Sequence, residues 1–285
     1  MKLSVMTLPL LPAPEIPGLE QKSKPPKTPS LSELYGQIKA AGASYLDISS
    51  LDFQFGGEAA VLSALAEHDM TCSCYLAFIE APGPTMEENM QAILAGKEAV
   101  EQTLRLGTKV MMFVPAGNQA AIQTLTRQEV ADAFIQVLRP VVEYAAKRGV
   151  TVVIEDAPHR EFPMCSEAEL RYLLEAVPGL RLVYDSGNML FAGEDPVDYY
   201  DHLADYVAHA HAKDISNGPS GELCECSHGQ GSVDFPTLFA HMRKNGFSGG
   251  IAVELAPDFE TKESVTKRVQ RALAYFNPIL TEVSK

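Results

Sequence analysis

The chain has 285 residues, of which 46% are hydrophobic, and its 37 acidic and 23 basic side chains give a formal net charge of −14. This charge, without any cluster of lysine or arginine, excludes nucleic acid as an expected partner. No segment approaches the roughly 18 apolar residues of a membrane helix, and α/β barrels of about 250 residues form one domain. We therefore expect one soluble domain over residues 1–285, with no membrane partner.

Cysteine usage bears on the compartment. The chain has five cysteines, and four of them form two C-x-C pairs, Cys72 with Cys74 and Cys224 with Cys226. An odd number without framework spacing fits a reducing cytoplasm better than a disulfide scaffold. The apolar amino terminus is interrupted by polar residues and proline and lacks a cleavage site, so we expect a first strand there, not a signal peptide.

In chain order, segments expected to be strands alternate with segments expected to be helices. Strands are expected over residues 2–7, 45–48, 71–79, 109–114, 151–155, 180–185, 206–211 and 250–254. Helices are expected over residues 30–41, 58–68, 85–106, 127–148 and 261–276, and after Ser166, Pro196 and Asp234. Ser-x-x-Glu and Thr-x-x-Glu sequences at several helix starts have capping-box spacing. Eight alternations predict an α/β protein that is a single (β/α)8 TIM barrel.

Proline and glycine mark three other segments. Residues 9–29 hold seven prolines, which predicts a long loop after the first strand that serves as a lid or as an oligomer contact. Pro140 lies inside an expected helix and predicts a kink or a break near Arg139. Residues 218–231 are expected to form a glycine-rich loop. Cys72 and Cys74 are expected on one face of their strand, as thiols of the core or of a pocket wall.

Four strands end in residues that can bind a metal. Glu155, Asp185, His211 and Glu254 each follow a run of apolar residues. Such runs are typical of parallel strands covered on both faces, whose carboxyl ends meet at the edge where α/β proteins build their sites. Three carboxylates at one place would repel one another unless a divalent cation joined them. The pattern predicts one Mn, Mg, Co or Zn ion with open positions for substrate oxygens.

These residues lie in motifs that resemble a known family. The motifs are Glu155, Asp185-Ser186-Gly187-Asn188, His211-Ala212-Lys213-Asp214, Gly229-Gln230-Gly231-Ser232-Val233-Asp234-Phe235 and Glu254. Their order on successive strands is similar to that of the sugar isomerase/epimerase superfamily, which has the xylose-isomerase-like TIM barrel also found in family 2 apurinic endonucleases. The resemblance covers residues 2 to about 276.

The resemblance implies an enzyme. It implies that Glu155, Asp185, His211 and Glu254 hold one divalent ion, with manganese expected first and magnesium, cobalt or zinc as alternatives. Glu155 and Glu254 would act as the catalytic acid/base pair. The expected reaction isomerises or epimerises a ketose or a related small polyhydroxy carbonyl compound, by proton abstraction next to the carbonyl and through a metal-stabilised enediolate. The expected partner is a small sugar or polyol, and the expected assembly is a homodimer or homotetramer.

Five further residues are expected around the substrate. Glu161 falls where related epimerases have a substrate-contacting carboxylate, and Asn188 stands where they usually have a histidine. His159 is expected to contact substrate hydroxyl groups. Lys213 is expected either to contact substrate or to form an ion pair with Asp214 that steadies the loop. His209 shares a strand face with His211, and we expect it partly buried, in support of the site or in contact with substrate, and not as a ligand.

Three other functions stay open. A lyase or dehydratase of the same superfamily would act on a keto-sugar or keto-polyol and begins with the same proton abstraction. An apurinic endonuclease needs three zinc ions and more histidines than the seven in this chain. A non-catalytic sugar-binding barrel would not need the ligand set. Cys224, Cys226 and His228 are residue types that bind zinc, but no fourth ligand follows at the usual spacing, so no second metal is expected there.

Overall fold

A closed barrel of parallel strands organises the computed structural model, which describes residues 1–11, 30–116, 124–156, 164–256 and 263–282. The strands follow the order β1-β10-β7-β6-β5-β4-β3-β2 around the barrel. Their bounds are β1 (Lys2–Met6), β2 (Tyr45–Ser49), β3 (Thr71–Ile79), β4 (Val110–Pro115), β5 (Thr151–Glu155), β6 (Arg181–Asp185), β7 (Val207–Ala212) and β10 (Gly250–Val253).

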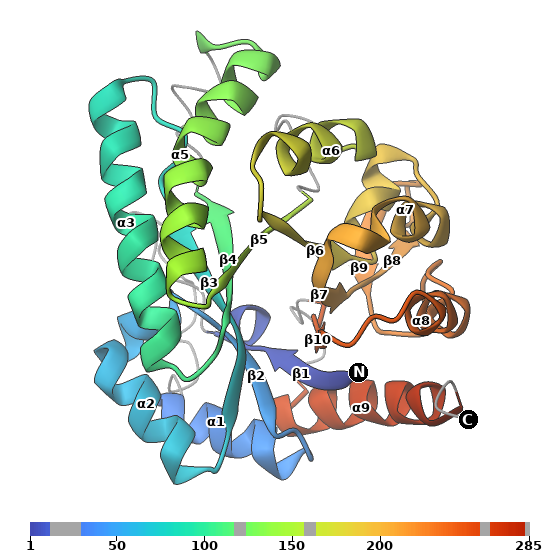
Figure 1. Cartoon of the computed structure of the whole chain (residues 1–285). Coiled ribbons are helices and arrows are strands. Elements are labelled where there is room, and N and C mark those ends of the chain that lie inside the picture. Colours follow the sequence, from blue (N-terminus) through green and yellow to red (C-terminus); the bar gives the residue numbers. More distant parts are fainter. Residues whose placement is uncertain (12–29, 117–123, 157–163, 257–262, 283–285) are drawn as a thin grey trace.

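Helices surround this barrel on its outer face (Figure 1). They are α1 (Leu31–Ala40), α2 (Gly57–Glu67), α3 (Met86–Arg105), α5 (Arg127–Lys147), α6 (Glu167–Ala176), α7 (Pro196–Leu203), α8 (Phe235–Lys244) and α9 (Val265–Glu282). The predicted (β/α)8 TIM barrel is confirmed. None of the helices in the described part of the chain is both long enough and apolar enough to cross a membrane.

Local sequence sets several helix starts. At α1, the Ser30 hydroxyl accepts a hydrogen bond from the backbone N–H of Glu33, whose carboxylate accepts one from the N–H of Ser30. α3 and α5 begin with the same reciprocal arrangement, at Thr85 and Thr126. Each of these boxes pairs two N–H groups that a helix start otherwise leaves unpaired. The expected helix starts at residues 30 and 85 are therefore confirmed together with their cause.

Two apolar clusters hold the barrel together. A large one lies between the strands and the helices, and a smaller one joins Met6, Cys74, Leu76, Met112, Val153 and Val183 from five strands. Cys72 belongs to the large cluster and Cys74 to the small one, so the two thiols do not share a face as expected. The cause is a shift in register between β2 and β3, where Leu46 pairs with Cys72 but Asp47 pairs with Cys74. An extra residue at such a bulge reverses the alternation of side chains.

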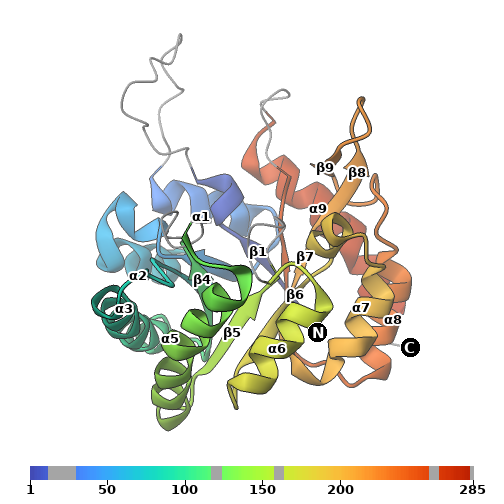
Figure 2. The same cartoon turned by 90° about the horizontal axis from the view of Figure 1, so that it is seen from above.

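The structure differs from the sequence-based expectation in three further places. α5 runs through Pro140 as one helix, so of the expected kink or break near Arg139 the break does not occur. The expected glycine-rich loop 218–231 contains a strand, β9 (Leu223–Cys226), which forms an antiparallel hairpin with the preceding β8 (Asp214–Asn217). This hairpin stands out beyond the barrel strands in Figure 2. α9 continues to Glu282, past the expected end at residue 276. The proline-rich segment 12–29 lies outside the described residues.

Candidate metal centre

Four neighbouring barrel strands supply the central residues of the site. Glu155 and Asp185 are the last residues of β5 and β6, His211 lies near the end of β7, and Glu254 directly follows β10. These strands are consecutive in the barrel, and Asp185 pairs in register with His211. One ligand atom from each of the four side chains lies within 4.8 Å of the others. The structure thus brings together all four residues that the sequence pointed to.

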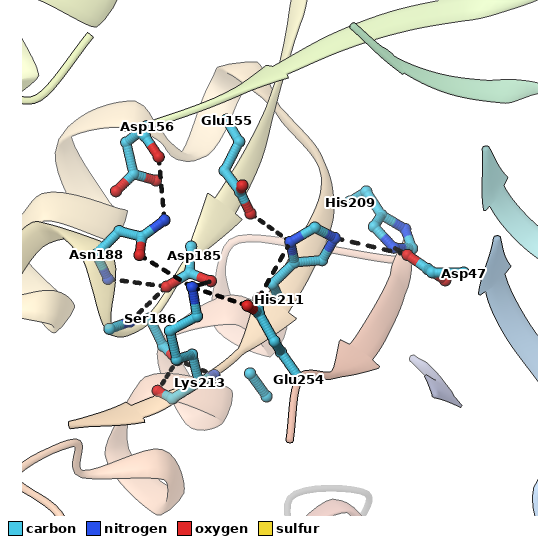
Figure 3. A network of polar contacts seen from close by, with 12 residues as sticks. Asp47, Glu155, Asp156, Asp185, Ser186, Asn188, His209, His211, Lys213 and Glu254 are labelled. Carbon is cyan, nitrogen blue, oxygen red and sulfur yellow. Dashed lines mark hydrogen bonds and ion pairs between the residues drawn. The ribbon is translucent and has the colours of Figure 1, made fainter. Parts of the chain in front are cut away.

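His211 occupies the middle of a chain of charged contacts (Figure 3). Its Nδ1 is hydrogen-bonded to the carboxylate of Glu155 and lies 3.9 Å from Oε2 of Glu254. Its Nε2 faces the other way and lies 3.6 Å from Oδ2 of Asp47. Burial alone would lower the pKa of His211, but Glu155 and Asp47 outweigh burial and hold this pKa well above its usual value. The ring therefore points Nδ1, and not Nε2, at the ligand set.

Lys213 adds a buried positive charge beside two of the carboxylates. Its Nζ lies 2.9 Å from Oε1 of Glu254 and 3.6 Å from Oδ2 of Asp185. The ammonium group also donates a hydrogen bond of 3.1 Å to Oδ1 of Asn188. Asn188 is held in turn by the bond that its side-chain amide donates to the carbonyl of Asp156. Both Lys213 and Asn188, two of the expected substrate contacts, thus lie next to the ligand set.

Burial and mutual repulsion perturb the carboxyl groups of the site. Burial raises the pKa of Glu254 to about 7, with Lys213 opposing the shift and Asp185 adding to it. Burial, Asp185 and Glu155 together raise the pKa of Asp156 well above its usual value. Carboxylates crowded into a poorly hydrated place favour their neutral forms unless a cation compensates them. Burial therefore moves the pKa of Glu254 from the acidic range towards neutrality.

The donor set fits a divalent cation. Three carboxylates and one imidazole suit Mn, Mg, Co or Zn. Oδ1 of Asp185 accepts hydrogen bonds from the N–H groups of Gly187 and Asn188, whereas its buried Oδ2 has no hydrogen-bond partner among the described residues. A buried carboxylate oxygen without a hydrogen-bond partner is well suited to bind a cation. The structure thus contains a possible metal site in which a cation would take the place of the proton on Nδ1 of His211.

Asp47 is the part of the site that the sequence did not reveal. It lies fully buried in β2, where its Oδ2 is 2.6 Å from Nε2 of His209 and its Oδ1 accepts a hydrogen bond from the hydroxyl of Ser4. Burial would raise the pKa of Asp47, but His209 and His211 outweigh burial and hold this pKa well below its usual range. The signal in the sequence was a carboxylate within an apolar strand, which only a buried partner explains.

The other expected residues fall into two groups. His159 and Glu161 lie outside the described residues. Cys224 lies on the hairpin beside Ser216, and Nε2 of His228 is 2.9 Å from the carbonyl of Ala212. These three residues do not belong to the groups of the described chain that could hold a metal ion, which are the four residues above and the trio of Asp47, Cys74 and His209.

Comparison with known proteins shows which family and which solved structures this barrel resembles. The family model "Xylose isomerase-like TIM barrel" matches residues 36–275. An inosose dehydratase of Geobacillus thermodenitrificans is 23% identical over 197 residues, which cover 60% of this chain and 64% of that protein, so the chain spans less than two thirds of this relative. Two solved structures share the fold. The zinc-bound IOLI protein has a TM-score of 0.75 at 18% identity, with 99% of each chain covered. The 3-keto-D-glucoside 4-epimerase YcjR of Escherichia coli has a TM-score of 0.71 at 17% identity, with 98% of this chain and 99% of that chain covered.

Proposed function

Since the chain belongs to the xylose isomerase-like TIM barrel family, we propose that it is a divalent-metal-dependent enzyme that isomerises or epimerises a small polyhydroxy ketone. The observation that carries the proposal is the convergence of Glu155, Asp185, His211 and Glu254, whose ligand atoms lie within 4.8 Å of one another. A divalent ion held there would polarise the carbonyl and neighbouring hydroxyl oxygens of a substrate and so stabilise the negative charge that develops when the adjacent C–H bond breaks.

Glu254 is the group best suited to move a proton. A base with a pKa close to the working pH can take a proton from carbon and return it with nearly equal ease. Burial brings the pKa of Glu254 to about 7, whereas an exposed glutamate titrates near 4.5. Glu155 and Glu254 both face Nδ1 of His211, and Glu155 is the second carboxylate of the proposed pair. Two bases on separate strands allow a proton to leave one face of a carbon and return to the other, as epimerisation requires.

Lys213 and Asn188 are the proposed contacts to substrate oxygens. The ammonium group of Lys213 touches Glu254 and Asn188, so it can donate a hydrogen bond to a hydroxyl group bound beside the base. The amide of Asn188 is anchored on the carbonyl of Asp156, which limits its rotation. Fixed donors of this kind orient a polyhydroxy substrate and exclude poses in which the wrong carbon faces the base. Glu161 and His159 remain proposed contacts on the basis of the sequence alone.

The second candidate is a dehydratase that acts on a keto-polyol. Loss of water after the same proton abstraction requires an acid near the departing hydroxyl group, and the ammonium of Lys213 lies 2.9 Å from the carboxylate of Glu254. The similarity to an inosose dehydratase points the same way. Isomerisation and dehydration therefore differ in one respect only, which is whether the proton returns to carbon or a hydroxyl group leaves.

The test is solvent-deuterium exchange followed by proton NMR. The protein is loaded in turn with Mn, Co, Mg or Zn and incubated in D2O with a panel of ketoses and keto-polyols. We expect deuterium at a carbon next to the carbonyl of at least one compound, and the products distinguish an isomer from a compound that has lost water. Glu254→Gln should reduce the exchange rate by at least about 10²-fold, the usual contribution of a general base.

Glu175→Gln is the matched control, because Glu175 is an exposed carboxylate on α6. This variant should exchange deuterium at the wild-type rate. Undiminished exchange in folded Glu254→Gln would contradict the role of Glu254, and a chain that binds none of the four metals would contradict the proposed function itself.

A further inference from the structure

A second layer of buried polar residues lies behind the metal ligands. His211 turns Nδ1 towards Glu155 and Glu254 and leaves Nε2 facing Asp47, whose Oδ2 is 3.6 Å away. Asp47 is itself held on both oxygens, by the hydroxyl of Ser4 at 2.7 Å and by Nε2 of His209 at 2.6 Å. Asp47 and His209 come from β2 and β7, which are separated in the barrel by β1 and β10, and both are buried.

This arrangement matters because an imidazole can bind a metal only through a nitrogen that carries no proton. If Nδ1 is to face a cation, the single proton of the neutral ring must sit on Nε2. A carboxylate beside Nε2 favours that tautomer, fixes the plane of the ring and makes the metal-binding nitrogen more basic. Oδ2 of Asp47 faces Nε2 at the ion-pair distance of 3.6 Å, and the buried Nε2 has no hydrogen-bond partner among the described residues.

We propose that Asp47, anchored by Ser4 and His209, is a positioning residue that keeps the proton of His211 on Nε2 and so presents Nδ1 to the metal. The inference rests on the proposed metal site and adds residues to it that touch neither metal nor substrate. It also gives His209 a role. The His209 ring holds Asp47 in place from β7, the strand that also carries His211. This contact explains why a buried histidine lies two residues before a proposed metal ligand.

The same residues invite another interpretation, a second metal site made of Asp47, Cys74 and His209. The contacts argue against it. Asp47 and His209 already satisfy each other, and Ser4 occupies the remaining oxygen of Asp47. Burial and the charge of Asp47 raise the pKa of the Cys74 thiol well above its usual value, and the protonated thiol is a poor ligand. The trio is therefore a support for His211, and it predicts one metal ion per chain, not two.

Cobalt titration tests the proposal without any need for the substrate. The purified chain is stripped with chelator and titrated with Co2+, whose visible absorption reports binding and stoichiometry. We expect one equivalent in the wild type. Asp47→Ala should weaken the affinity by about 10- to 100-fold, which is typical for loss of a residue that orients a ligand. Asp47→Asn keeps an acceptor for His211 but loses the charge, so its affinity should fall by a smaller factor, roughly 3- to 10-fold.

Asp52→Asn is the matched control. Asp52 is as deeply buried as Asp47 and accepts bonds from Ser49, Thr7 and Tyr35, but it does not face His211. This variant should lose stability and keep wild-type Co2+ affinity. If Asp47→Ala does not fold, the comparison of Asp47→Asn with Asp52→Asn still decides the question.

Nitrogen-15 NMR of the Zn2+-loaded, histidine-labelled chain gives an independent readout. In the wild type, the Nε2 proton of His211 should be visible and exchange slowly with solvent, whereas in Asp47→Ala it should broaden or exchange rapidly. Wild-type affinity within twofold and an unchanged Nε2 signal in folded Asp47 variants would overturn the inference and leave the proposed function intact. A second equivalent of Co2+ that disappears in Asp47→Ala would overturn it in favour of a second metal site. A wild-type chain that binds no Co2+ would remove both the inference and the proposed function.

Discussion

Replacement of Lys213 by methionine tests whether the carboxylates of the site depend on its buried charge. The ammonium group lies 2.9 Å from Glu254 and 3.6 Å from Asp185. At 2.9 Å and an effective dielectric constant of about 20, Coulomb attraction to one carboxylate is about 6 kcal/mol. Dehydration of the ammonium opposes part of this, and removal of one partner from a buried pair usually costs roughly 3–5 kcal/mol. We expect Lys213→Met to lower the free energy of unfolding by that amount.

The expected loss depends on pH, because Glu254 titrates near neutrality. The pKa of Glu254 is raised to about 7, so in the folded wild type the ionised fraction of this carboxyl increases from pH 6 to pH 8. The ammonium group of Lys213 stabilises the ionised carboxylate of Glu254 and has little effect on its neutral form. Lys213→Met should therefore be less destabilised at pH 6 than at pH 8.

Added metal should rescue the variant. A ligand present at 100 times its dissociation constant stabilises the folded state by about 2.7 kcal/mol. In Lys213→Met, a divalent cation replaces the lost positive charge and is not repelled by an ammonium group. The cation should therefore stabilise the variant more than it stabilises the wild type. Urea unfolding followed by circular dichroism, with chelator or with Co2+ at pH 6 and pH 8, measures all of these effects.

Lys109→Met is the control, because Lys109 is exposed at the start of β4 and should change stability by no more than about 0.5 kcal/mol. Two results would show that the carboxylates do not depend on Lys213. Lys213→Met would match the wild type at pH 8, or its loss of stability would be the same at both pH values and would not be reduced by Co2+.

Two further predictions concern the segment between β7 and α8. The buried carboxylate of Asp214 accepts hydrogen bonds from four backbone N–H groups, so Asp214→Ala should cost about 3–5 kcal/mol in urea unfolding. Asp234→Ala, which removes only the N-terminal cap of α8, should cost about 1 kcal/mol. Burial lowers the pKa of His228, which packs on Phe276 and donates to the carbonyl of Ala212. In the unfolded chain His228 therefore binds a proton near pH 6.5, whereas in the folded chain it stays neutral at that pH. The free energy of unfolding decreases as the pH falls below that value. In His228→Phe, the decrease of the free energy of unfolding with falling pH should be smaller, by up to about 1.4 kcal/mol per pH unit. Urea unfolding of both proteins between pH 7 and 5.5 measures this difference.

Local features of the sequence predicted the barrel and the four residues of the proposed metal site. Ser30 and Thr85 with their glutamates start two helices, because capping is completed within four residues. Apolar strands that end in Glu155, Asp185, His211 and Glu254 predicted one shared site, since parallel strands of a barrel deliver their carboxyl ends to one rim. Neither inference needed contacts between distant segments beyond the closure of the barrel itself.

Only the tertiary structure decided how the site is supported. Asp47 meets His209 across 162 positions of sequence, and no local pattern on β2 specifies that partner. The bulge between β2 and β3 could not be predicted from the sequence either, because one extra residue leaves the apolar character of the strand unchanged. The bulge nevertheless places Cys72 and Cys74 in different apolar clusters. The direction of each nitrogen of His211 depends on charges from three other strands or strand ends. Short-range patterns set which residues reach the rim, whereas the closed barrel sets which of them meet.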